Sequence, residues 1–147
     1  VLPNRKMNMV DFRLKDLSEI FVTDSDIEKI RIDPIYFEYY RYNITDVAAI
    51  QLRRVIEVLD AYPEMIIKIE SHTDQRGTDY FNKTLSTNRA NSTKDWLIEN
   101  GIDPSRIQSA IGYGESQPIN ICDEEGKTCT ELEYSENRRS EFIVVSR

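Results

Sequence analysis

An aspartate and an arginine near the middle of the chain are of types that could together bind a small charged ligand. In a helix of about 100° per residue, Arg89 falls in the same arc as the apolar Leu85 and Leu97. A guanidinium directed at the protein interior needs an anion, because an isolated buried charge costs several kcal/mol. The nearest anionic candidate is Asp74, fifteen residues earlier.

Two arrangements of Asp74 and Arg89 fit this spacing. In the first, the two side chains form a partly buried ion pair and need no ligand. In the second, they stand apart and a zwitterion bridges them. The ammonium of an amino-acid head group then meets Asp74, while its carboxylate takes a bidentate contact from Arg89. The sequence alone leaves both arrangements open.

His72 suggests a catalytic alternative, because an imidazole titrates near neutral pH and Asp74 lies two residues further on. A hydrolase would use these two residues as acid and base. No nucleophile completes the pair convincingly, since neither Ser71 nor Ser86 lies in a Gly-x-Ser-x-Gly turn. We therefore expect a packed or rim histidine and no enzymatic activity.

The two cysteines, Cys122 and Cys129, enclose a short polar stretch that we expect to be a loop. Their number alone leaves both a disulfide and a pair of free thiols open. A disulfide would indicate an oxidising compartment. A zinc site is disfavoured, because the spacing is not Cys-x-x-Cys and His72 is the only histidine. We expect no metal ion and no cofactor.

The hydrophobic pattern predicts alternating strands and helices that position these residues. Strands are expected at residues 35–37, 65–71, 107–115 and 141–145. Helices are expected between Thr45 and Tyr62, and from Thr78 or Asp79 to Glu99 or Asn100. The order β-α-β-α-β-β predicts an α+β fold, a two-layer sandwich with the helices packed on one mixed sheet. It places Asp74 at the end of the second strand and Arg89 on the helix that follows.

The first 30 residues differ from the rest of the chain. They mix charges with scattered apolar positions and show no sustained period, so residues 1–30 are expected to be a linker or N-terminal extension. Residues 31–147 are expected to form one domain. The chain begins with Val1, and no apolar run approaches 18 residues. We therefore expect a fragment of a longer protein without a membrane-spanning segment of its own.

The charge balance excludes one class of partner. The 147 residues include 19 Lys and Arg and 26 Asp and Glu, which gives a net charge of −7 and a pI near 4.8. Because nucleic-acid binding needs a basic surface, we expect no nucleic-acid partner. An acidic polymer would not be attracted over a long range either. Its recognition would have to be local, at one arginine and a helix N-terminus.

Four motifs in succession resemble the peptidoglycan-binding domain of the OmpA, MotB and Pal type. They are Ser71-His72-Thr73-Asp74, the segment from Asn82 to Ala90, Gly112-Tyr113-Gly114-Glu115, and Asn137-Arg138-Arg139. The resemblance covers roughly residues 32–147. The loop between the cysteines is similar to that of a family branch with a cysteine-closed loop, which implies a Cys122–Cys129 disulfide.

This resemblance implies non-catalytic, non-covalent binding of the peptidoglycan stem peptide. Asp74 and Arg89 would hold the zwitterionic end of diaminopimelate, and Asn82 would line the same pocket. The other expected site residues are Tyr40 near the ligand, Arg76 and Gly77 with their backbone facing the bound carboxylate, Thr73, and Arg138. Many relatives have smaller residues than Tyr39 and Tyr40 at the pocket rim, so a bulkier and more aromatic rim is expected here.

The resemblance also implies a location and a role. An upstream portion would be associated with the outer membrane, and the domain would anchor that membrane to the cell wall from its periplasmic face. The full-length protein could be an oligomer. A competing hypothesis is that the same fold serves as a protein-interaction module.

Overall fold

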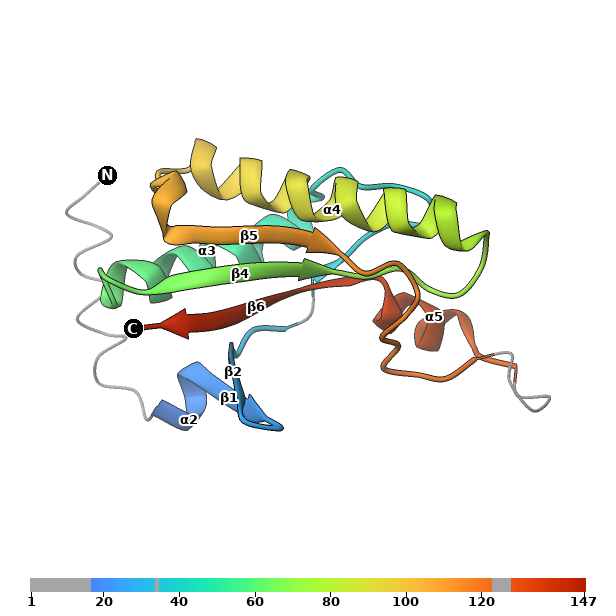
Figure 1. Ribbon diagram of the computed structural model, residues 1–147, viewed down its shortest axis with the longest axis horizontal. Coiled ribbons are helices and arrows are strands. Elements are labelled where there is room, and N and C mark those ends of the chain that lie inside the picture. Colours follow the sequence, from blue (N-terminus) through green and yellow to red (C-terminus); the bar gives the residue numbers. More distant parts are fainter. Residues whose placement is uncertain (1–16, 34, 123–127) are drawn as a thin grey trace.

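The computed structural model describes residues 17–33, 35–122 and 128–147 (Figure 1). Its elements are, in chain order, α2 (Leu17–Ile20), β1 (Phe21–Asp24), β2 (Ile27–Ile30), β3 (Ile35–Tyr36), α3 (Asp46–Ala61), β4 (Ile66–Ser71), α4 (Asp79–Glu99), the 3-10 helix η1 (Pro104–Arg106), β5 (Ile107–Gly112), α5 (Glu131–Asn137) and β6 (Arg139–Ser146). No helix in these described ranges is both long and apolar enough to cross a membrane.

One mixed sheet forms the centre of the fold. Its strands lie in the order β1-β2-β6-β4-β5, and the short β3 pairs with β6 off this path. Strands β4 and β5 are parallel, whereas β6 is antiparallel to β4, with Ser71 opposite Ser140. The carboxyl ends of β4 and β5 therefore meet the amino end of β6 at one edge of the sheet, next to α5 (Figure 1).

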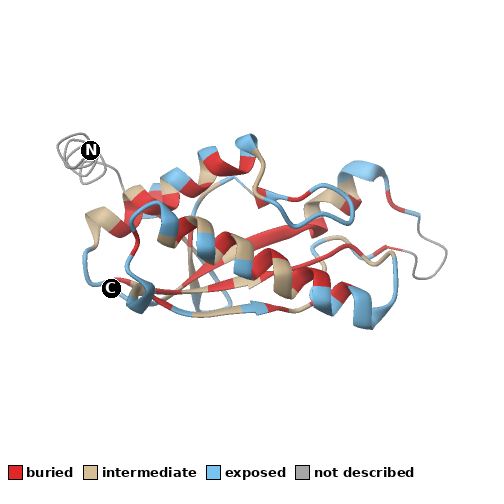
Figure 2. Cartoon of the chain, turned by 90° about the horizontal axis from the view of Figure 1, so that it is seen from above, coloured by how far each residue is buried: buried red, intermediate tan, exposed pale blue. Residues whose placement is uncertain are grey.

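The two long helices, α3 and α4, bury their inner faces against this sheet. In α3, apolar residues recur at three- and four-residue steps, and Leu52, Val55 and Leu59 are fully buried. Strand β4 alternates, so that Ile67 and Ile69 enter the same core. Figure 2 shows the buried residues on the inner helix faces and along the strands, with exposed residues on the outer helix faces. The predicted α+β class with helices packed on one mixed sheet is confirmed.

Both long helices begin at the threonines that the sequence indicated. The hydroxyl oxygen of Thr45 accepts a hydrogen bond from the Ala48 N–H, and that of Thr78 accepts one from the Phe81 N–H, each at 3.1 Å. Such caps contribute about 1 kcal/mol each. At the other end of α4, Gly101 has a φ of 105°, which a glycine adopts at little cost.

Residues 17–30, expected to belong to a linker or N-terminal extension, are part of the folded domain. They form α2 and the β1–β2 hairpin, and β2 pairs with β6. Ile20, Phe21 and Ile30 are buried in the main core. Strands of four residues are too short to give a sustained alternation in the sequence, which is why the pattern did not reveal them. Residues 1–16, the rest of the predicted linker or N-terminal extension, lie outside the described part of the chain.

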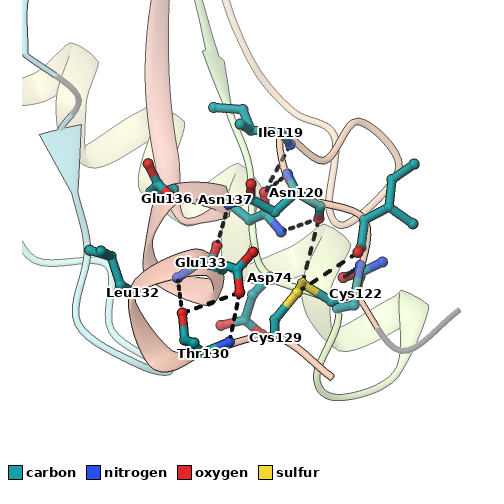
Figure 3. The surroundings of a disulfide bond; sticks show 12 residues. Asp74, Ile119, Asn120, Cys122, Cys129, Thr130, Leu132, Glu133, Glu136 and Asn137 are labelled. Carbon is teal, nitrogen blue, oxygen red and sulfur yellow. Dashed lines mark hydrogen bonds between the residues drawn. A yellow bond between two sulfur atoms is a disulfide. The ribbon is translucent and has the colours of Figure 1, made fainter. Parts of the chain in front are cut away.

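Helix α5 was also not predicted. It begins with a capping box, in which the Thr130 hydroxyl oxygen accepts from the Glu133 N–H at 3.2 Å and the Glu133 carboxylate accepts from the Thr130 N–H at 3.0 Å (Figure 3). The Thr-x-x-Glu spacing is a helix-start signal that the sequence does contain. Strand β5 ends at Gly112, earlier than expected, and β6 begins at Arg139, also earlier than expected.

Gly112 lies where β5 packs directly against α4. A Cβ atom at this position would clash with the backbone nitrogen of Thr87 and with the side chain of Ser86. We expect Gly112→Ala to force α4 away from β5 and to lower the free energy of unfolding by about 3 kcal/mol, as overpacking does. Urea unfolding followed by circular dichroism measures this. The matched control is Ile111→Ala at the neighbouring, exposed position, with an expected loss of about 1 kcal/mol or less. Equal losses in the two variants would contradict the close helix–strand approach.

Candidate functional site

The residues expected to bind ligand lie at the edge of the sheet where β4 ends. They surround a narrow, closely packed hollow, which we call the Asp74 pocket. Its lining residues are Tyr39, Tyr40, Thr73, Asp74, Arg76, Asn82, Leu85, Arg89 and Arg138. All of the predicted binding residues except Gly77 are among them, together with Tyr39, which the sequence placed at the rim, and Leu85, which was not assigned to the site from the sequence.

Two arginines hold the buried carboxylate of Asp74. Arg76 donates from its backbone N–H and from Nε to Oδ1, at 3.0 and 3.2 Å, and from Nη2 to Oδ2 at 2.9 Å. Arg138 donates from Nη1 to Oδ2 at 2.9 Å. Burial alone would raise the pKa of Asp74, but these hydrogen bonds outweigh it and hold the pKa below the ordinary 3.8. Asp74 is therefore an anion at neutral pH.

Arg89 is fully buried, and carbonyl oxygens accept its hydrogen bonds. Its Nε donates to the carbonyl of Arg41 at 2.8 Å, its Nη1 to that of His72 at 3.1 Å, and its Nη2 to that of Glu38 at 3.1 Å. Burial, reinforced by the positive charge of Arg138, lowers the pKa of Arg89 to about 9. Arg89 is thus a cation at neutral pH, in an environment that disfavours its charge.

These contacts bear on the two arrangements proposed for Asp74 and Arg89. Asp74 is paired with Arg76 and Arg138, and the described residues include no ion pair between Asp74 and Arg89. The structure therefore contradicts the arrangement in which the two satisfy each other directly. The separated anion and cation that the second arrangement requires are both present in one pocket.

Three other predicted or neighbouring polar groups lie beside Asp74. Asn82 donates from Nδ2 to the Asp74 carbonyl at 3.3 Å and to a carboxylate oxygen of Glu115 at 2.9 Å. The Thr73 hydroxyl lines the pocket, is buried, and has no hydrogen-bond partner in the described structure. Burial raises the pKa of Glu115, although the hydrogen bond from Asn82 opposes this. Asn82 and Thr73 thus bring neutral polar groups to the pocket.

The expectation for the backbone of Arg76 and Gly77 needs correction. The Arg76 N–H donates to the carboxylate of Asp74, so it does not face a ligand, and it is the Arg76 side chain that lines the pocket. Gly77 lies outside the lining with a φ of 99°, close to the side chains of Asn82 and Phe81. The physical reason is that the carboxylate of Asp74 folds back onto the N–H two residues later, as aspartates in turns commonly do.

The rim of the pocket is aromatic, as the sequence indicated, and the rings are packed together. The rings of Tyr39 and Tyr40 stack at 3.9 Å, and the guanidinium of Arg76 lies 4.2 Å from the ring of Tyr39 and 4.2 Å from that of Tyr134. Tyr40 has a φ of 60°, and its ring makes an edge-to-face contact with Phe81 at 5.1 Å. A left-handed backbone at a tyrosine costs roughly 1–2 kcal/mol, which the ring contacts help to offset.

Glu131, the first residue of α5, is a site residue that the sequence did not reveal. Its carboxylate binds Arg76 at 3.1 Å and Arg138 at 3.3 Å, so it touches both arginines that hold Asp74. These contacts lower the pKa of Glu131. The capping box after Thr130 could have indicated the helix, but the pairing with Arg76, 55 positions away, depends on the tertiary fold.

The predicted disulfide between Cys122 and Cys129 is present. It packs against Tyr134, the residue whose ring lies next to Arg76. The Cys122 N–H donates to the side-chain oxygen of Gln75 at 3.1 Å, and Figure 3 shows Asp74 among the residues around the disulfide. The bridge therefore connects α5 to the segment that carries Asp74. Residues 123–127, inside the loop, lie outside the described residues.

His72 is a packed histidine, as expected. Its side chain is buried against the ring of Tyr113, and neither ring nitrogen has a hydrogen-bond partner in the described ranges. Burial, reinforced by the charge of Arg139, lowers the pKa of His72 to about 4, so the imidazole is neutral at pH 7. No contact joins it to the carboxylate of Asp74, whose partners among the described residues are two arginines. The acid–base pair of the hydrolase alternative is not assembled.

One group of side chains in the described structure has the composition of a metal site. The ligand atoms of Glu70, His72 and Glu141 lie within 4.8 Å of one another. Both carboxylate oxygens of Glu141 are already paired, with Lys29 at 3.0 Å and with Arg139 at 2.9 Å. Because the protein's own cations neutralise this carboxylate, we assign no metal ion to the group.

Comparison with known proteins identifies the family. Residues 36–129, almost two thirds of the chain, match the sequence profile of the OmpA family. The chain belongs to the OmpA family. The predicted resemblance to domains of the OmpA, MotB and Pal type is thereby confirmed.

Two curated relatives illustrate the range of this OmpA family. The chain is 35% identical over 112 residues to the peptidoglycan-associated lipoprotein of Agrobacterium fabrum, a match that covers 76% of this chain and 59% of the relative. It is 30% identical over 96 residues to outer membrane porin F of Pseudomonas aeruginosa, covering 65% of this chain and 27% of the porin. The matches therefore span 59% or less of the length of these two relatives.

Solved structures of other proteins share the fold. The peptidoglycan-associated lipoprotein from Burkholderia pseudomallei superposes with a TM-score of 0.66 at 24% identity, covering 76% of this chain and 88% of the other. The cell wall anchor of the T6SS from Pseudomonas aeruginosa gives a TM-score of 0.62 at 19% identity, with 96% of each chain covered. At these identities the structures support the architecture of the chain and not its residue roles.

The buried neutral His72 leads to a prediction on pH. Its folded-state pKa, about 4, lies below the 6.5 of an unfolded chain, so between these values the unfolded state binds more protons. The free energy of unfolding should therefore decrease as pH falls from 6.5 to 4, by about 3 kcal/mol in total from this residue. Urea unfolding at several pH values measures the slope. His72→Phe keeps a ring against Tyr113 but cannot titrate, so it should lose this contribution. Parallel pH profiles of the two proteins would show that His72 is not the cause.

Proposed function

We propose that this chain binds peptidoglycan non-covalently and without catalysis, and that it anchors a membrane to the cell wall. The observation that carries this proposal is the Asp74 pocket, where buried Arg89 stands apart from the buried carboxylate of Asp74 and donates to carbonyl acceptors. Membership in the OmpA family supports it, because relatives of the chain include proteins named as peptidoglycan-associated lipoproteins and as a cell wall anchor.

The ligand that suits this pocket is the zwitterionic end of an amino acid, and in peptidoglycan this is the diaminopimelate of the stem peptide. A guanidinium has about five N–H groups, and Arg89 uses three of them on carbonyl oxygens. The N–H groups that remain, one on each Nη, would donate to a ligand carboxylate. Such charge-assisted bonds would supply the anion that a buried cation otherwise lacks. The ligand ammonium would bind Asp74, and the Thr73 hydroxyl, which has no partner among the described residues, supports a further polar contact.

We expect the affinity of each single site to be modest and the combined attachment of many sites to be strong. A single amino-acid head group offers few atoms, so its affinity is limited by the entropy lost on binding. Peptidoglycan repeats the same stem peptide many times, and many copies of the protein tethered to one membrane would act together through effective concentration. Weak individual contacts are therefore compatible with firm attachment.

We also propose a setting for the chain, the periplasmic face of the outer membrane. The disulfide between Cys122 and Cys129 supports an oxidising compartment. The names of the relatives, a lipoprotein and an outer membrane porin, support an association with that membrane. The membrane attachment itself would come from a portion of the protein beyond the present sequence.

Asp74→Asn and Arg89→Lys test the proposed site. Asp74→Asn removes the charge that would meet the ligand ammonium, whereas Arg89→Lys keeps its charge but loses the fork of N–H donors that would bind the ligand carboxylate. We therefore expect co-sedimentation with insoluble peptidoglycan to weaken at least tenfold in each variant, on the order of the cost of breaking a buried charged contact. Circular dichroism checks the fold. The matched controls are Asp95→Asn and Arg53→Lys, the same substitutions at exposed helix positions outside the pocket, and both should bind as the wild type does.

Two outcomes would contradict the proposal. Unchanged sedimentation of folded Asp74→Asn and Arg89→Lys would mean that the wall-binding site lies elsewhere. Release of soluble wall fragments by the wild-type protein, lost in His72→Ala, would instead identify a hydrolase.

A further inference from the structure

The carboxylate of Asp74 has no free position for a ligand in this structure. An ionised carboxylate offers about four lone-pair positions. The backbone N–H and Nε of Arg76 occupy Oδ1, and Nη2 of Arg76 and Nη1 of Arg138 occupy Oδ2. A ligand ammonium can therefore reach Asp74 only when one of these donors leaves.

The side chain of Arg76 is the donor that is able to leave. Arg138 has only 8% of its side chain exposed and also donates from Nε to the carbonyl of Phe37 at 2.9 Å, which fixes its guanidinium in place. The Arg76 side chain is 29% exposed and lies on the segment between β4 and α4. It supplies two of the four hydrogen bonds, so its departure would open one position on each carboxylate oxygen of Asp74.

A second partner for Arg76 is already in contact. Nη1 of Arg76 lies 3.1 Å and Nη2 lies 3.4 Å from the carboxylate of Glu131, which is 66% exposed at the start of α5. An outward rotation of the guanidinium would keep this ion pair and the contact with Tyr134 while it releases Asp74. The exchange conserves charge, because one cation leaves the carboxylate of Asp74 and one ammonium replaces it.

We infer that Arg76 competes with the ligand ammonium for Asp74, and that Glu131 receives Arg76 when the ligand binds. This inference rests on the proposed function and makes Arg76 the residue that sets ligand selectivity. With Arg76 on Asp74, the pocket offers only cations, namely Arg76, Arg89 and Arg138, and suits a simple carboxylate. With Arg76 on Glu131, it offers one open position on each carboxylate oxygen of Asp74, together with the cation Arg89, and suits a zwitterion. In the unliganded protein, Arg76 helps to neutralise the buried carboxylate of Asp74, which would otherwise destabilise the fold as an unpaired charge.

Arg76→Met tests this inference with two probes, meso-diaminopimelate and pimelate, which share a carbon chain and two carboxylates but differ in the ammonium groups. Isothermal titration should show that the variant binds diaminopimelate about fivefold more tightly than the wild type and pimelate about fivefold more weakly, a change of about 1 kcal/mol each way, typical of a partly exposed ion pair. The matched control is Arg53→Met, whose guanidinium lies over Trp96 and outside the pocket; it should leave both affinities unchanged.

Glu131→Gln provides a second, independent readout. It removes the charge that receives Arg76, so the affinity of the otherwise wild-type protein for diaminopimelate should fall about threefold, as expected for the loss of one exposed ion pair. In the Arg76→Met background the same substitution should have a smaller effect, because Arg76 is no longer there to be received and only the contact of Glu131 with Arg138 remains. A double-mutant cycle measures this coupling.

The outcomes separate this inference from the function on which it rests. If diaminopimelate binds the wild type and Arg76→Met weakens both probes alike, Arg76 holds the ligand rather than competing with it, and the inference is wrong while the proposed function stands. The inference is also wrong if Glu131→Gln acts equally in both backgrounds. If diaminopimelate does not bind the wild type at all, the ligand assignment and the inference both fail.

Discussion

The burial of one guanidinium without a carboxylate partner among the described residues is the constraint on which this edge of the molecule depends. The three carbonyl groups that accept hydrogen bonds from Arg89 belong to Glu38, Arg41 and His72, so the arginine ties the segment after β3 to the end of β4. Burial, reinforced by the positive charge of Arg138, lowers the pKa of Arg89 to about 9. An anion beside the buried guanidinium of Arg89 would stabilise its charge, and we propose that the ligand carboxylate is this anion.

Asp74 shows the complementary case, a buried anion with cations in excess. Arg76 and Arg138 both bind it, and Glu131 on α5 in turn binds both arginines. Helix α5 is held in place by its own capping box and by a disulfide that packs on Tyr134. The cysteine-closed loop is therefore connected to the pocket through packing and ion pairs. Through these contacts, the Cys122–Cys129 disulfide helps to position the arginines that bind Asp74.

The sequence was informative where a local pattern determines the structure, and uninformative where partners meet only in the folded chain. The helical period showed that Arg89 would point inward, and the strand before Asp74 placed the aspartate at a sheet edge; both hold in the structure. The partners of Asp74 could not be predicted from the sequence. Arg138 lies 64 positions away and reaches Asp74 only because β6 pairs antiparallel with β4. The β1–β2 hairpin was missed because its strands are short, although its apolar residues complete the core. Helix α5, with its Thr-x-x-Glu start, was visible in principle.

A crystal structure of the protein with bound meso-diaminopimelate is the most direct test of the view that the pocket separates two charges for a zwitterion. We expect a ligand carboxylate within hydrogen-bond distance of the Arg89 guanidinium, a ligand ammonium at Asp74, and the Arg76 side chain turned to Glu131. A ligand found away from these two residues, or one bound with its ammonium in solvent and Arg76 still on Asp74, would contradict the account.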